Sequence, residues 1–139
     1  MVLLVGARQT GKSTLIQSDR FAKRTFLTFD DATTLSAAKS DPEGFLAGYT
    51  GAVTIDEVQR VPELFLAIKA TVDHNRTAGR FLLSGSADVL FLPKLADSLA
   101  GRMEVLRLRQ LFQGEIEGRR ERFVDLVFGK APLKLKAIP

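Results

Sequence analysis

Cysteine and tryptophan are absent from this 139-residue sequence, and histidine occurs once. Without cysteine the chain has neither a disulfide framework nor a thiolate metal site. A single histidine also argues against a zinc site built only from protein ligands. The sequence therefore excludes the disulfide-stapled classes, and it is compatible with a reducing compartment.

Long apolar runs are missing as well. No stretch approaches the roughly 20 residues that cross a bilayer, and the first residues lack the charged segment, apolar stretch and cleavage site of a secretion signal. We therefore expect a cytoplasmic protein. The ten phenylalanines fall mostly at core spacing and do not suggest a platform for stacking bases.

The composition, 45% hydrophobic and 26% charged, is that of one ordinary globular domain. The net charge of +4 comes entirely from residues 119–139, where six cations face two carboxylates. A solvated basic tail explains this surplus better than a nucleic-acid-binding arm. We assign residues 1–128 to the core and residues 129–139 to a basic tail or to the start of a missing C-terminal region. The first strand begins at residue 2 and no element closes the chain, so we expect the front part of a longer protein.

Short apolar runs alternate with helix-like stretches, the pattern of an α/β protein with a mainly parallel sheet. We expect strands at residues 2–5, 25–29, 52–55, 81–83 and 103–108, covered on both faces. Proline at positions 42 and 62 marks the first turn of two helices, and further helices are expected at 88–100, 112–118 and 121–128. The expected fold is a three-layer α/β/α fold with five strands in the order 5-1-4-3-2.

A phosphate-binding motif directly follows the first apolar run. Residues 6–13, GARQTGKS, match glycine, any four residues, glycine, lysine and serine or threonine, between a strand and a helix. Backbone N–H groups of such a loop surround phosphate oxygens, the lysine reaches the β- and γ-phosphates and the serine hydroxyl ligates Mg²⁺. The candidate nucleotide-binding residues are Gly6, Ala7, Arg8, Gln9, Thr10, Gly11, Lys12, Ser13 and Thr14.

Two consecutive carboxylates end the third apolar run. Asp56 fits the carboxylate that holds Mg²⁺ together with Ser13, and Glu57 fits the base that takes a proton from the attacking water. Two solvated carboxylates in a turn are the alternative, which the phosphate loop disfavours.

Polar residues follow the fourth apolar run. Ser84 or Ser86 is the candidate for contact with the γ-phosphate, and the alternative is a Ser-Gly turn that simply ends the strand. Arg102 lies just before the fifth strand. As a cation near a helix end it can stabilise helix carbonyls.

Taken together, the segments GARQTGKSTLIQ, TIDEVQRVPELFLAIK, FLLSGSADVLFLPKLADSLAGRMEVLRL and QGEIEG resemble the ATPase domain of a prokaryotic AAA-type family. The resemblance covers residues 2–128 and implies ATP binding and Mg²⁺-dependent hydrolysis. It implies that residues 6–13 are the phosphate loop, that Asp56 and Glu57 are the magnesium and water carboxylates, and that Ser84 or Ser86 is the sensor. It also makes Arg102 a candidate arginine finger. The family usually carries a C-terminal domain and a helical segment before the first strand. By this resemblance we expect this sequence to lack that segment and nearly all of the C-terminal domain.

The leading hypothesis is an ATPase with Lys12, Glu57, Ser84 and Arg102 as catalytic residues, whose hydrolysis of ATP drives a conformational change in a partner domain. The expected cofactors are ATP and Mg²⁺, and a homo-oligomer and nucleic acid are further candidate partners. One alternative is a small-molecule kinase, which shares the loop. Another is a nucleotide-dependent switch, associated with DNA or protein, that hardly turns ATP over.

Overall fold

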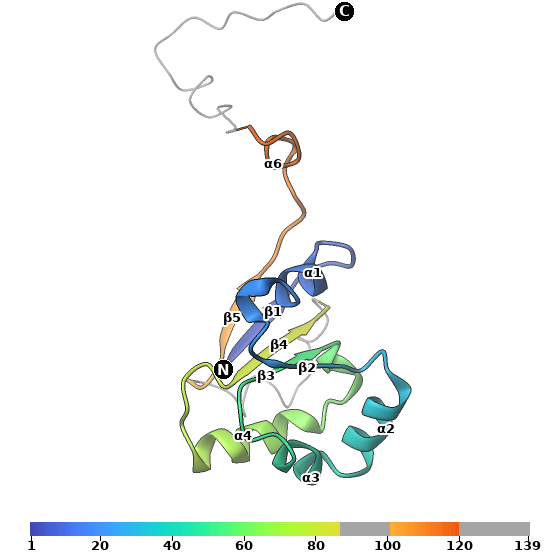
Figure 1. Cartoon of the computed structure of the whole chain (residues 1–139), viewed down its shortest axis with the longest axis vertical. Coiled ribbons are helices and arrows are strands. Elements are labelled where there is room, and N and C mark those ends of the chain that lie inside the picture. The colour runs from blue at the N-terminus through green and yellow to red at the C-terminus, as the bar shows by residue number, and fades with distance from the viewer. Residues whose placement is uncertain (87–100, 120–139) are drawn as a thin grey trace, which may run out of the picture.

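Five parallel strands form one sheet in the order β2-β3-β4-β1-β5 (Figure 1). Read from the other edge, this is the expected order 5-1-4-3-2, so the predicted fold is confirmed. The computed structural model describes residues 1–86 and 101–119. The helices expected at 88–100 and 121–128, and the tail at 129–139, lie outside the described residues.

The strands lie close to their predicted positions, and three of the expected helices are present. The elements in chain order are β1 (Val2–Val5), α1 (Lys12–Ile16), η1 (Asp19–Phe21), β2 (Thr25–Thr28), α2 (Ala32–Ser40), α3 (Pro42–Ala47), β3 (Val53–Asp56), η2 (Val58–Arg60), α4 (Leu64–His74), β4 (Phe81–Gly85), β5 (Glu104–Arg107) and α6 (Gln113–Ile116). Helix α2 was not predicted, although Asp31 signals its start by accepting a hydrogen bond from the Thr34 N–H at 2.7 Å.

Strand β1 is apolar throughout because both of its faces are covered. Leu3 and Val5 join the larger core cluster, to which α4 contributes Phe65 and Ile68. Leu4 points to the opposite face and packs with Ile16 of α1. Figure 1 shows α2, α3 and α4 gathered on one side of the sheet and α1 on the other. Removing each large side chain from water contributes about 1.5–3 kcal/mol to folding.

The edge strands differ from the prediction of strands covered on both faces. All four residues of β5 are exposed, and β2 begins with two exposed residues. Both strands have a neighbour on one side only, β1 for β5 and β3 for β2. An apolar run thus predicted a strand, while its place in the sheet decided how much of it is buried.

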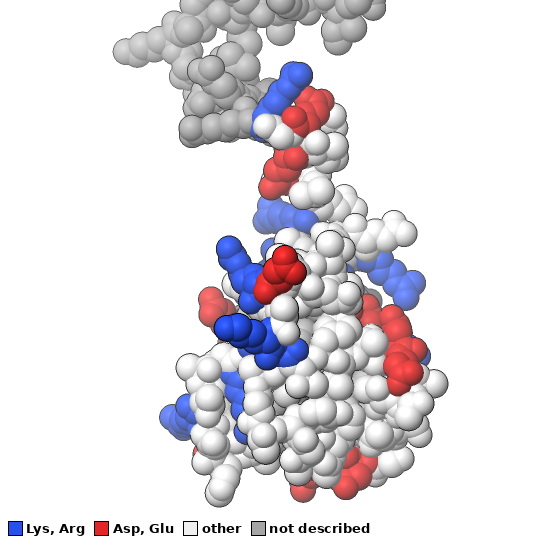
Figure 2. Space-filling view, in the orientation of Figure 1, with Lys and Arg blue, Asp and Glu red and all other residues white. Residues whose placement is uncertain are grey.

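Charged side chains are mixed on the surface in view. On that face, positive and negative groups are interspersed over the folded body (Figure 2). In the ranges 1–86 and 101–119, no helix has both the length and the apolar character needed to cross a bilayer.

Candidate functional site

The loop between β1 and α1 turns back tightly on itself. Gly11 has φ 84°, in the left-handed region that glycine adopts without steric cost. The Thr10 hydroxyl donates to the Ala7 carbonyl at 3.0 Å, which closes the loop internally. Thr10 and Lys12 are buried, whereas Ala7 to Gln9 and Gly11 are exposed to solvent.

The Lys12 ammonium is held by neutral acceptors. Its Nζ donates to the carbonyl oxygens of Gly6 at 3.0 Å and Ala7 at 2.7 Å. Among the ion pairs of the described residues none involves Lys12. A buried cation without a counter-ion is costly, so this position favours an anionic ligand.

A cavity of about 260 Å³ opens beside this loop. It brings together predicted residues from the loop, from the end of β3 and from beyond β4. Its lining consists of Arg8, Gln9, Gly11, Lys12, Ser13, Thr14, Glu57 and Ser86. The carboxyl ends of β1, β3 and β4 meet at one edge of the parallel sheet, which is why these distant residues converge.

Asp56 is the most heavily bonded side chain at this edge. It is 4% exposed. Oδ2 accepts from Ser13 Oγ at 2.8 Å, and Oδ1 accepts from the Glu57 N–H at 3.0 Å and from Ser84 Oγ. These three donors offset the cost of removing a carboxylate from water, and they hold Asp56 next to the loop serine.

Glu57 has an unusual backbone conformation. Only Gln9 and Glu57 among the non-glycine residues described have positive φ, at 63° and 57°. Both line the cavity. Such conformations cost about 1–3 kcal/mol each and tend to cluster where function requires a particular geometry. The left-handed conformation of Glu57 turns the chain away from the direction of β3. Glu57 therefore borders the cavity, while the preceding carboxylate, that of Asp56, is buried.

The two candidate sensor serines occupy different environments. Ser84 is fully buried within β4 and donates to Asp56. Ser86, two residues further, lines the cavity. Ser84 lies inside β4 and supports Asp56, whereas Ser86 follows the end of β4 at Gly85 and faces the space beside the loop.

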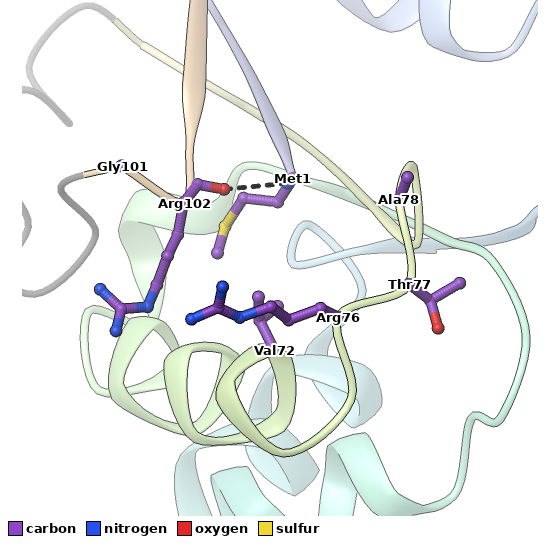
Figure 3. Close-up of a pocket in the computed structure, with 7 residues that line it drawn as sticks. All are labelled: Met1, Val72, Arg76, Thr77, Ala78, Gly101 and Arg102. Atoms are coloured by element: carbon purple, nitrogen blue, oxygen red, sulfur yellow. Dashed lines mark hydrogen bonds between the residues drawn. The ribbon is translucent and has the colours of Figure 1, made fainter.

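Arg102 lies at the end of the sheet where the strands begin, opposite the end that carries the cavity. Figure 3 shows it beside Met1. Its carbonyl accepts from the Met1 nitrogen at 3.0 Å, just before β1 and β5 begin, whereas the loop follows the end of β1. The Arg102 Nε donates to Asp73 Oδ1 of α4. Figure 3 also shows Arg76 and Val72 of this neighbourhood beside Arg102. Arg102 is therefore not brought to the cavity of its own chain.

The Arg102 pair also affects Asp73. Its hydrogen bond lowers the pKa of the Asp73 carboxyl below the usual 3.8, and the positive charges of Arg102, Lys69 and Arg76 act in the same direction. Because the folded-state pKa is depressed, the stabilisation by this pair is present above the ordinary pKa and is lost as the pH falls through the lowered value.

Sequence reasoning missed two polar residues. Gln59 of η2 donates from Nε2 to Glu57 Oε2. Arg24 donates to Thr54 Oγ1 at 2.9 Å and to three backbone carbonyls, those of Val53 at 2.6 Å and of Gly79 and Arg80 at 2.8 Å. Burial lowers the pKa of Arg24. The amide two positions after Glu57 was a usable signal for Gln59, whereas nothing local marks Arg24.

The oxygen atoms at the site are suitable ligands for Mg²⁺. Ser13 Oγ and the Asp56 carboxylate are hard ligands, and this ion is usually held by one or two protein oxygens, substrate phosphates and water. Residues 1–86 and 101–119 contain no group of three or more His, Cys, Asp or Glu side chains arranged for a metal ion. The two oxygens of Ser13 and Asp56 fit a Mg²⁺ ion that is bound together with a phosphate ligand.

A parallel sheet in this order, with a glycine-containing loop after β1, defines a P-loop fold of the nucleotide-binding class. A family model described as "AAA domain" matches residues 1–117, so the chain belongs to the AAA domain family. Membership supports nucleotide binding and, at the level of the family, an ATPase-type hydrolase.

Two curated relatives are similar to this chain over most of its length. Uncharacterized proteins of Mycobacterium tuberculosis and Mycobacterium bovis are each 40% identical over 114 residues, which is 80% of this chain. The match spans 25% of each relative, so the chain covers about a quarter of their length.

Proposed function

We propose that the chain binds ATP with Mg²⁺ and hydrolyses it, and that hydrolysis drives a conformational change in a partner domain or protein. The buried Lys12 ammonium, which has only loop carbonyls as acceptors, is the observation that carries this proposal. A triphosphate supplies the missing negative charge. The cavity of about 260 Å³ lies below the ~300–1,000 Å³ of pockets that enclose a whole ligand, and it fits the phosphate end of a nucleotide.

In this mechanism Lys12 exchanges the carbonyls of Gly6 and Ala7 for β- and γ-phosphate oxygens. Ser13 and Asp56 would hold Mg²⁺, which would supply positive charge against the negative charge of the phosphates. Ser84 keeps the Asp56 carboxylate in place through its hydrogen bond.

Glu57 borders the cavity and accepts a proton from the attacking water. The water oxygen bonds to the γ-phosphorus, and the bond from that phosphorus to the β–γ bridging oxygen breaks. The electron pair of that bond leaves with ADP, and the second product is inorganic phosphate. Ser86, which lines the cavity, is the residue that we propose to contact the γ-phosphate.

The test is ATP hydrolysis by the full-length natural polypeptide with Glu57→Gln. We expect unchanged affinity for ATP with Mg²⁺ and a loss of about 10²–10⁴-fold in kcat, because the amide keeps the shape of the side chain but accepts no proton. Glu43→Gln, at an exposed position in α3, is the matched control and keeps the wild-type rate. Wild-type hydrolysis by Glu57→Gln would remove the general-base role.

Two additions to the assay separate the alternatives. ADP formed without an added acceptor supports the ATPase, whereas transfer that needs a hydroxyl compound supports a kinase. Phosphate release measured with and without DNA identifies a DNA-associated switch. Asp56→Asn is expected to weaken the Mg²⁺ dependence of ATP binding, since it removes the carboxylate that holds the ion.

A further inference from the structure

Gln59 contacts the carboxylate proposed as the base. Glu57 has φ 57° and ψ 39°, and this left-handed turn leads directly into η2. Gln59 then lies two residues further, with its Nε2 donating to Glu57 Oε2. The amide orientation follows from chemistry, because an ionised carboxylate requires a donor and the amide oxygen would repel it. No other hydrogen bond to the Glu57 side chain is present among the described residues.

The other end of the Gln59 amide makes no hydrogen bond. Gln59 Oε1 is buried, and it has no partner in the described part of the chain. Leaving an acceptor buried and unpaired lowers stability. An apolar side chain of similar length avoids that loss. Stability therefore does not explain an amide at this position.

Gly85 provides the space that the amide occupies. A Cβ added at Gly85 would lie 2.6 Å from Gln59 Oε1, whereas its next neighbour, Val58 Cγ1, would be at an ordinary 3.6 Å. Gly85 is the last residue of β4 and lies between Ser84 and Ser86 in the sequence. The Gln59 amide therefore lies between the end of β4 and the Glu57 carboxylate.

We propose that Gln59 is a positioning residue, which holds one oxygen of Glu57 so that the carboxylate faces the water that attacks the γ-phosphate. This inference rests on the proposed function. Restricting the carboxylate to one orientation raises the fraction of bound complexes with reactive geometry, and a misplacement of about 1 Å can cost about 10²-fold in rate. A larger residue at position 85 would displace the Gln59 amide oxygen.

Gln59→Met in the full-length natural polypeptide tests the proposal. The substitution keeps the length of the side chain and removes both the donor and the unpaired acceptor. We expect kcat for ATP hydrolysis to fall about 10–100-fold, with the affinity for ATP and Mg²⁺ changed less than about twofold and the melting temperature unchanged or higher. A crystal structure of the variant should show the Glu57 side chain in a different or split position.

Gln113→Met is the matched control. Gln113 also donates to a glutamate, Glu117 at 2.7 Å, but it lies on the exposed helix α6. We expect wild-type kcat from this variant. Gln59→Asn, which is too short to reach Glu57 from the same backbone position, should not rescue the rate.

A second variant tests the role of Gly85. Gly85→Ala should lower kcat in the wild-type background by displacing the amide oxygen. In the Gln59→Ala background the added methyl group meets no amide, so Gly85→Ala should have no further effect on kcat. This non-additivity is specific to a contact between the two positions.

The outcomes separate failure of the inference from failure of the proposed function. Wild-type kcat in Gln59→Met, with Glu57→Gln inactive, overturns the positioning role and leaves the ATPase intact. A lower melting temperature with proportional losses in affinity and rate assigns Gln59 a purely structural role and also overturns it. If the wild-type polypeptide releases no phosphate from ATP, the proposed function fails and the inference fails with it.

Discussion

Ser13 and Asp56, 43 positions apart in the chain, are joined by a hydrogen bond of 2.8 Å from Ser13 Oγ to Asp56 Oδ2. It links the first turn after the phosphate loop to the end of β3. The neighbouring Oδ1 is bonded to Ser84 of β4. Three segments, α1, β3 and β4, therefore meet at one carboxylate.

Lys12→Ala is expected to raise the dissociation constant for ATP more than tenfold. The phosphates lose a charge-assisted contact worth roughly 1.5–3 kcal/mol. Titration with a fluorescent nucleotide measures this constant. Lys39→Ala, at an exposed position in α2, is the control for a general loss of positive charge. An unchanged constant in Lys12→Ala would contradict the assignment of the phosphate loop.

The variants Ser84→Ala and Ser86→Ala should distinguish two roles, the hydrogen bond that supports Asp56 and the contact with the phosphate. Ser84→Ala removes one of three donors to a buried carboxylate. We expect it to lower the free energy of unfolding by about 1–3 kcal/mol and to weaken Mg²⁺-dependent ATP binding. Ser86→Ala should leave the unfolding free energy unchanged and lower kcat.

Urea unfolding and phosphate release measure these two effects. If both variants lose the same stability, the hydrogen bond from Ser84 to Asp56 does not distinguish them. If Ser84→Ala alone affects kcat at saturating Mg²⁺ and ATP, then Ser84 rather than Ser86 takes the sensor position.

Arg102 is expected to act on the site of a neighbouring copy, because it lies at the opposite edge of the sheet from the loop of its own chain. An arginine that stabilises transition-state charge in trans is worth about 10³–10⁵ in rate. Arg102→Ala and Glu57→Gln, each inactive alone, should regain partial activity when full-length proteins are mixed. A mixed interface then pairs one intact base with one intact arginine.

Asp73→Asn is the control for this experiment, since it removes the partner of Arg102 in α4 and leaves the guanidinium in place. Suppose that mixing restores no activity and Arg102→Ala only lowers the melting temperature. In that case the ion pair with Asp73 accounts for Arg102, and the trans role is wrong.

Arg24→Ala is expected to destabilise the fold by about 2–3 kcal/mol, because it removes the hydrogen bonds that a charged group donates to Thr54 and to backbone carbonyls of two neighbouring segments. Arg24→Lys should be intermediate, since an ammonium lacks the planar fork that reaches several acceptors. Urea unfolding measures the loss. Arg20→Ala, exposed in η1, should change stability by less than about 0.5 kcal/mol. Equal losses in Arg20→Ala and Arg24→Ala would remove the special role of Arg24.

The fold was largely readable from local patterns. Apolar runs at β1, β3 and β4 are continuous because both faces of these central strands are buried, and Pro42 marks the first turn of α3, where Asp41 caps the Gly44 N–H at 2.9 Å. Helix α2 was missed because its residues carry only a weak apolar periodicity. Its start is signalled by one capping aspartate, which is easily assigned to a turn.

The sequence by itself determined the phosphate loop and the acidic pair, since both depend on residue types at short, fixed spacing. Tertiary structure alone decided that Ser84 supports Asp56 while Ser86 faces the cavity, that Arg24 bonds to three carbonyls of distant segments, and that Arg102 lies at the far edge. These contacts depend on strand order and on register, and a shift of one residue in register reverses which face a side chain occupies. Gln59 meets Glu57 for a related reason, because a left-handed residue redirects the chain at the end of β3.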